Sequence, residues 1–91
     1  MLRETQVAAI YPIRKMLTDL WVGRIMSDRL DVWLYGIMRL MRCGQDEAIE
    51  PDILLDWLEA DVRFVAAGQA GTADRDTLLL LADTVHAAYA D

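Results

Sequence analysis

The chain has 91 residues, 55% of them hydrophobic, and a formal net charge of −6 at pH 7. A chain of this size forms a single domain with a modest core, and its single cysteine, Cys43, excludes an intrachain disulfide and favours a reducing, cytoplasmic setting. We recognise no signal peptide, and the charge-free runs are far shorter than the roughly 20 residues of a membrane span, so we expect a soluble protein without a membrane partner.

Apolar residues recur at three- and four-residue spacing almost throughout, which predicts an all-α protein. Turn-forming residues cluster at 44–51 and 68–72 and divide the chain into a small antiparallel bundle of about four helices. The hydrophobic content exceeds the roughly 45 to 50% of an average globular domain. We therefore expect excess apolar surface and a homo-oligomer.

The first helix is expected over residues 12–24. Pro12 suits a first helical turn, where its missing N–H costs nothing. Residues 2–10 are then a separate short helix or a kinked extension, and the segment 1–11 could act as an N-terminal arm.

The second helix is expected over residues 28–43. Ser27 or Asp28 is a favourable N-cap, and Gly44 is placed to take the left-handed conformation after the last turn. Acidic residues in the first turn and basic residues in the last turn suit the helix dipole.

The third helix is expected over residues 51–67, with Pro51 in its first position and Gly68 after its end. Its polar face carries Glu59 and Arg63, which are spaced to form a salt bridge. Apolar residues cover the rest of its circumference, a wider arc than an ordinary surface helix has. We expect this helix to contact more than one neighbour.

The fourth helix is expected over residues 73–89 and carries four consecutive leucines, Leu78 to Leu81. At roughly 100° per residue these cannot all face one side, so at least one is exposed or is buried against a second subunit. The predicted core of the bundle consists of Trp21, Trp33, Leu34, Ile37, Leu54, Trp57, Leu58, Val62, Leu78, Leu81 and Val85.

Charge is divided between the two halves of the chain. Residues 1–44 carry seven bases and four acids, a net +3, whereas residues 45–91 carry two bases and eleven acids, a net −9. Opposite potentials steer association and fix orientation. The halves are expected to pair within one chain or between two copies, or to select a charged partner.

The acidic run around the start of the third helix is the main candidate for protein binding. It could occupy a basic groove on another protein, or mimic nucleic acid there, whereas the plainer alternative is a solvated face that keeps the protein soluble. The candidate residues are Asp46, Glu47, Glu50, Asp52, Asp56 and Glu59.

The basic half offers a candidate anion site, in which arginines and tyrosines at an oligomer interface hold a nucleotide or another anion. The alternative is that these bases pair with the acidic half. Direct DNA binding is disfavoured, because the helix that would enter the groove carries acids that phosphates repel. The candidate residues are Tyr11, Arg14, Lys15, Tyr35, Arg39 and Arg42.

Catalytic and metal-binding signals are weak. His86 with Asp83 could form an oriented imidazole, and Cys43 with His86 a nucleophile and base, but a structural role is favoured for both. Asp52, Asp56 and Glu59 could share a cation, although no histidine is near. We expect no enzyme, no metal and no cofactor.

The leading hypothesis is a non-enzymatic regulator, inhibitor or assembly chaperone that binds a protein through its acidic helix and exposed apolar surface. Its partner would have a basic or apolar groove. An oligomeric anion-binding module and a nucleic-acid mimic are the alternatives. A small acidic factor of this kind fits a bacterial or phage origin.

Overall fold

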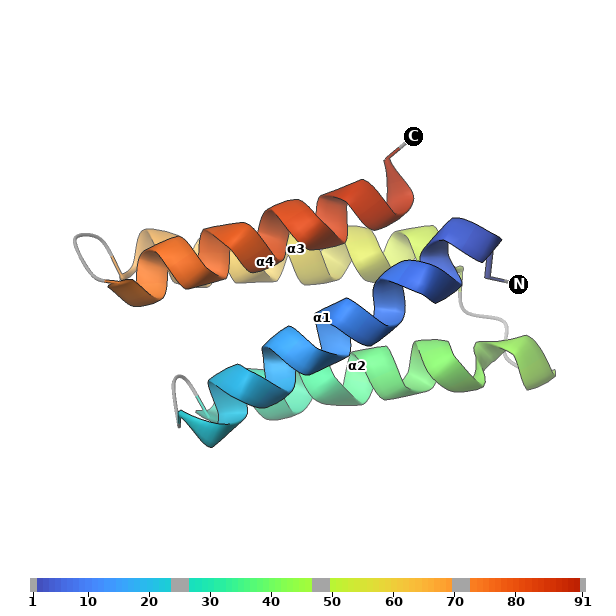
Figure 1. Cartoon of the computed structure of the whole chain (residues 1–91), viewed down its shortest axis with the longest axis horizontal. Coiled ribbons are helices and arrows are strands. Elements are labelled where there is room, and N and C mark those ends of the chain that lie inside the picture. Colours follow the sequence, from blue (N-terminus) through green and yellow to red (C-terminus); the bar gives the residue numbers. More distant parts are fainter. Residues whose placement is uncertain (1, 24–26, 47–49, 70–72, 91) are drawn as a thin grey trace.

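The structure is a computed structural model that describes residues 2–23, 27–46, 50–69 and 73–90. Within these ranges it contains four helices and no strand, so the expected all-α bundle is confirmed (Figure 1). None of these helices is long and apolar enough to cross a membrane within the described ranges. The helices are α1 (Glu4–Val22), α2 (Ser27–Asp46), α3 (Pro51–Ala67) and α4 (Ala73–Tyr89).

Each helix packs against two others in a closed order, with α1 and α3 both lying between α2 and α4. Helices α1 and α4 form the near layer of Figure 1, and α2 and α3 form the far layer. The most extensive packing joins α3 to α4. All four helices contribute to one apolar core, whose fully buried side chains include Ile13, Leu17, Leu30, Trp33, Leu40, Leu55, Val62, Leu78, Leu81 and Val85.

Helix α1 is continuous from Glu4 to Val22, so the expected boundary at Pro12 is wrong. Proline removes one backbone hydrogen bond, here the bond to the carbonyl of Ala8. Both Pro12 and Ala8 are exposed, and water can therefore solvate the freed carbonyl. Ile10 and Ile13, on either side of the proline, are both buried, and this packing holds the two halves of the helix in line.

Helix α2 is longer than expected, because it continues through Gly44 to Asp46. The expected stop at Gly44 is wrong, since glycine also adopts right-handed helical dihedral angles. The bounds expected for α3 and α4 are confirmed. Pro51 occupies the start of α3 and is buried, and Gly68 follows its end.

The predicted core is confirmed at Trp33, Ile37, Leu58, Val62, Leu78, Leu81 and Val85, whereas Leu34 and Leu54 are partly buried. It is wrong at Trp21 and Trp57, which are 52% and 39% exposed. Trp21 lies near the end of α1, and Trp57 lies on the outer side of α3. Of the four leucines, Leu80 is the exposed one, at 60%.

Candidate interaction surface

The acids at the start of α3 are engaged by the chain's own termini. Asp52 accepts hydrogen bonds from Arg3 Nη1 at 3.1 Å and from Gln6 Nε2 at 2.5 Å. The Gln6 side chain is buried, and its Oε1 also accepts the backbone N–H of Arg3 at 3.0 Å. Asp56 accepts a hydrogen bond from the Tyr89 hydroxyl at 3.0 Å. These carboxylates therefore attach α1 and α4 to α3.

Glu59 is the centre of a polar cluster between α3 and α4. Its carboxylate is 12% exposed and contacts Arg63 Nε at 2.6 Å, His86 Nδ1 at 2.8 Å and the Tyr89 hydroxyl. Burial disfavours the charged form of Glu59, but the hydrogen bonds from Tyr89, Arg63 and His86 outweigh it and lower its pKa to about 2. The expected pairing of Glu59 with Arg63 is confirmed.

The same cluster differs from the alternative in which Asp83 orients the His86 imidazole. Asp83 accepts a hydrogen bond from Arg63 Nη2 at 2.9 Å, and the imidazole contacts Glu59 instead. Burial and the adjacent carboxylates, Glu59 first, raise the pKa of Tyr89 well above its usual value. The cluster is an ion-paired seam that joins the two C-terminal helices.

The remaining acidic candidates are Asp46, the last residue of α2, Glu47 and Glu50. Glu50 is exposed and precedes the first residue of that helix. The side chain of Asp46 and the whole of Glu47 lie outside the described residues. A role for these acids in partner binding stays a prediction. The described carboxylates of α3 form hydrogen bonds within the chain.

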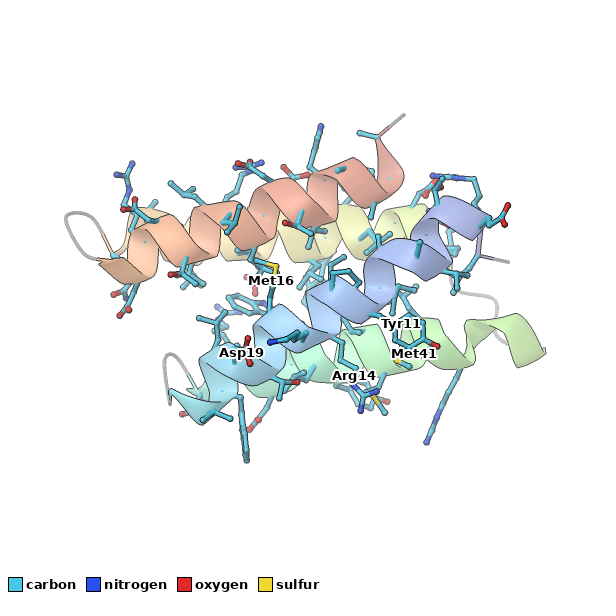
Figure 2. All side chains as sticks on the ribbon, in the orientation of Figure 1. Tyr11, Arg14, Met16, Asp19 and Met41 are labelled. Atoms are coloured by element: carbon cyan, nitrogen blue, oxygen red, sulfur yellow. The ribbon has the colours of Figure 1, made fainter. Side chains whose placement is uncertain are left out.

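The basic candidates are distributed over two helices. Figure 2 shows Tyr11 and Arg14 extending from α1 over α2 near Met41, whereas Met16 points toward α4. Lys15 pairs with Asp19 at 2.9 Å. The hollow beside Tyr11 is lined by apolar or aromatic side chains and by no base, namely Leu2, Val7, Ile10, Tyr11 and Met41.

The basic candidates of α2 are placed on its exposed side. The Arg39 guanidinium lies 5.8 Å from the centre of the Tyr35 ring, a cation–π contact within the helix. Arg42 is exposed one turn further along. An anion site formed by these residues at an oligomer interface stays a prediction.

The outer side of α3 carries a second apolar stripe, on a helix that the sequence predicts to contact more than one neighbour. Its five residues follow a 4-3-4-3 spacing, and all are exposed. Ile53 is 68% exposed and Phe64 is 72% exposed. We call this set the outer stripe: Ile53, Trp57, Ala60, Phe64 and Ala67. The core-facing residues of α3 follow a 3-4-3 spacing, each one or two positions after a member of the outer stripe: Leu55, Leu58, Val62 and Val65.

Helix α2 borders the outer stripe closely at one point. Gly36 is buried, and a Cβ placed there would be 3.5 Å from Trp57 Cζ3 and 4.0 Å from Leu54 Cδ1. The absence of a side chain at Gly36 lets the Trp57 indole lie against the backbone of α2. Val32, one turn earlier on α2, is 45% exposed and extends the apolar surface.

An open hollow lies at the C-terminal end of the outer stripe. Phe64 and Ala67 line it from α3, and Arg29 lines it from α2, together with Val65, Gly68 and Gln69. Arg29 also pairs with Asp61 at 3.3 Å. The outer stripe therefore ends in a concave region that a side chain of another helix can enter.

In the part of the chain that the structure describes, no group of three His, Cys, Asp or Glu residues could hold a metal ion. The Cys43 side chain lies outside the described residues, so neither its favoured structural role nor the alternative pairing with His86 is tested. Comparison with known proteins finds no matching family model, no similar curated protein and no similar solved structure.

Proposed function

We propose that the chain is a non-enzymatic protein-binding module that pairs with an amphipathic helix through the outer stripe of α3. The observation that carries this proposal is the exposure of three large side chains, Ile53, Trp57 and Phe64, along one face of a helix. Contiguous exposed apolar surface on a small domain is typical of an interaction site. Regulators, inhibitors and assembly chaperones are the classes of protein that use such a surface.

The spacing of the outer stripe favours a helix as the partner. Apolar residues at alternating intervals of four and three form the seam of a helix pair, in which each side chain fits between those of the facing helix. Burying a side chain such as Ile53 or Phe64 stabilises an interface by roughly 1.5–3 kcal/mol. A helix with apolar residues at the same spacing therefore suits this surface.

The proposed binding surface is the apolar outer face of α3 and not its acidic face. Asp52 and Glu59 both accept hydrogen bonds from other helices of the same chain. A partner that took these carboxylates would have to replace bonds that hold the bundle together. No comparable replacement is needed at Phe64, which is 72% exposed.

A synthetic three-heptad peptide with Leu at the 4-3 positions tests the proposal. It carries a fluorophore and is used at nanomolar concentration, so that it does not pair with itself, and its anisotropy is followed as the chain is added. We expect saturable binding, weakened about tenfold or more by Phe64→Ser, as for a central interface residue. Leu80→Ser, on the exposed side of α4, is the matched control and should bind as the wild type does.

Two results would contradict the proposal. One is equal binding of a peptide with the same composition in scrambled order. The other is equal loss of binding in the Phe64→Ser and Leu80→Ser variants, which would indicate general stickiness.

A further inference from the structure

Resting on the proposed function, we infer that the helix that covers the outer stripe is α3 of a second copy, running antiparallel with the two Ala60 residues facing each other at a two-fold axis. A two-fold interface uses one patch on both copies, so the patch must be complementary to itself. The outer stripe can meet this requirement with the axis at Ala60. Antiparallel pairing centred on Ala60 places Trp57 opposite Phe64 of the second copy and Ile53 opposite its Ala67.

The sizes of the side chains fit this register. Ala60 at the axis faces a second Ala60, and small residues at a crossing point let two helix backbones approach closely. Outward from the axis, the aromatic rings of Trp57 and Phe64 face each other, and beyond them the large Ile53 faces the small Ala67. The open hollow beside Phe64 and Ala67 lies where Ile53 of the second copy would enter.

The charges beside the outer stripe favour the antiparallel direction. Asp56 and Arg63 both border the stripe on the side next to α4. Because they lie at similar distances on either side of position 60, antiparallel pairing places Asp56 across from Arg63 of the second copy. The two-fold axis produces this pairing twice. Parallel pairing would instead bring Asp56 toward Asp61 of the second copy, which sets like charges against each other.

These charges select orientation more than they add affinity. Arg63 already pairs with Glu59 and Asp83 in its own chain, and its side chain is 40% exposed. Exposed ion pairs contribute little to stability. The apolar contacts at Trp57 and Phe64 provide the association, and we therefore expect it to persist at high salt.

The first test measures the mass in solution by light scattering and by sedimentation equilibrium, from micromolar to millimolar chain. We expect twice the chain mass of 10.3 kDa at the higher concentrations, at low and at high salt. Ala60→Arg sets two like charges against each other at the axis and should give a monomer with unchanged circular dichroism, because Ala60 is exposed. Leu80→Arg is the matched control and should remain a dimer.

The second test distinguishes the antiparallel from the parallel arrangement by cysteine cross-linking in a Cys43→Ser background. Ala60→Cys should form a disulfide-linked dimer under mild oxidation, because the two positions meet at the axis. Ala67→Cys should not form one. In the antiparallel register, position 67 faces position 53 of the second copy, which lies fourteen residues, roughly 21 Å along the helix, from position 67 of that copy. Efficient cross-linking at both positions would indicate parallel pairing and overturn the inference.

The outcomes separate this inference from the proposed function. If the wild type stays monomeric at millimolar concentration but binds the heptad peptide, the inference that a second copy covers the outer stripe is wrong. The proposed helix-pairing function would then still hold. A dimer that Ala60→Arg leaves intact overturns the register. A monomer that also fails to bind the peptide overturns both.

Discussion

Trp33 on α2 donates its indole N–H to Asp61 on α3, with Nε1 and Oδ2 2.5 Å apart. The Trp33 side chain is fully buried, so its N–H has to find a partner inside the protein. Asp61 also accepts a hydrogen bond from Arg29, at 3.3 Å. One carboxylate therefore fixes the position of α2 along α3, and with it the border of the outer stripe.

Asp61→Ala should destabilise the fold by about 1–3 kcal/mol, because it leaves the buried Trp33 N–H without an acceptor. For a domain of this size each kcal/mol lowers the melting temperature by roughly 4–8 °C. Thermal unfolding followed by circular dichroism measures the change. Asp31→Ala, at an exposed position of α2, is the control and should melt within a degree or two of the wild type. Equal melting temperatures for the two variants would show that the Trp33 contact contributes nothing.

Gly36→Ala should stabilise the protein. A Cβ at this position would be 3.5 Å from Trp57, an ordinary van der Waals distance, and alanine is favoured over glycine inside a helix by about 1 kcal/mol. Gly36→Leu should instead lower stability, since its longer side chain would displace Trp57. Urea unfolding of both variants measures the two effects, and a loss of stability in Gly36→Ala would show that Trp57 cannot accept the added methyl group.

Helix number and the bounds of α3 and α4 follow from local signals in the sequence. Pro51 and Gly68 mark the two ends of α3, and the turn cluster before residue 73 marks the start of α4. The predicted helix start at Pro12 is wrong, because the packing of buried residues on both sides of the proline outweighs its preference for a first helical turn. Residues such as proline and glycine show where a helix can end, whereas tertiary packing decides whether it does end there.

The candidate surface was harder to predict, because helical periodicity cannot tell a second apolar stripe from a second intramolecular neighbour. The position of Trp57 in the sequence fits a buried residue and a residue of an exposed stripe equally well. Its exposure depends on how α2 crosses α3 at Gly36. The hydrogen-bond partners of the acids are also distant in sequence, since His86, which contacts Glu59, lies 27 residues further along the chain. The 4-3-4-3 spacing at Ile53, Trp57, Ala60, Phe64 and Ala67 was present in the sequence and is the signal that could have identified this surface.

Stability should fall as the pH drops from about 4.5 to about 2, in part because of Glu59. Its pKa is lower in the folded protein than in the unfolded chain, so the unfolded state binds more protons in this range. The contribution of Glu59 is therefore present above its unfolded pKa and is lost as the pH falls through the folded value. Other carboxylates titrate in the same range, so the wild type must be compared with Glu59→Gln.

Urea unfolding at a series of pH values makes this comparison. The difference in unfolding free energy between wild type and Glu59→Gln should be largest near neutral pH and should shrink toward pH 2. Tyr89→Phe removes one hydrogen bond to Glu59 and should move the acid transition of the protein upward in pH. A constant difference across the series would mean that the Glu59 charge is not what the cluster stabilises.

Pro12 and Pro51 should respond to alanine substitution in opposite directions. Pro12→Ala restores an N–H in the middle of α1, where an interior proline costs about 3 kcal/mol or more in an isolated helix, and part of that cost should be recovered as stability. The gain is reduced because alanine gives the unfolded chain more freedom. Pro51→Ala removes a buried ring from the start of α3, a position that suits proline, and should destabilise the protein. Differential scanning calorimetry of both variants decides the matter: a lower melting temperature for Pro12→Ala would mean that the proline bends α1 in a way the bundle needs.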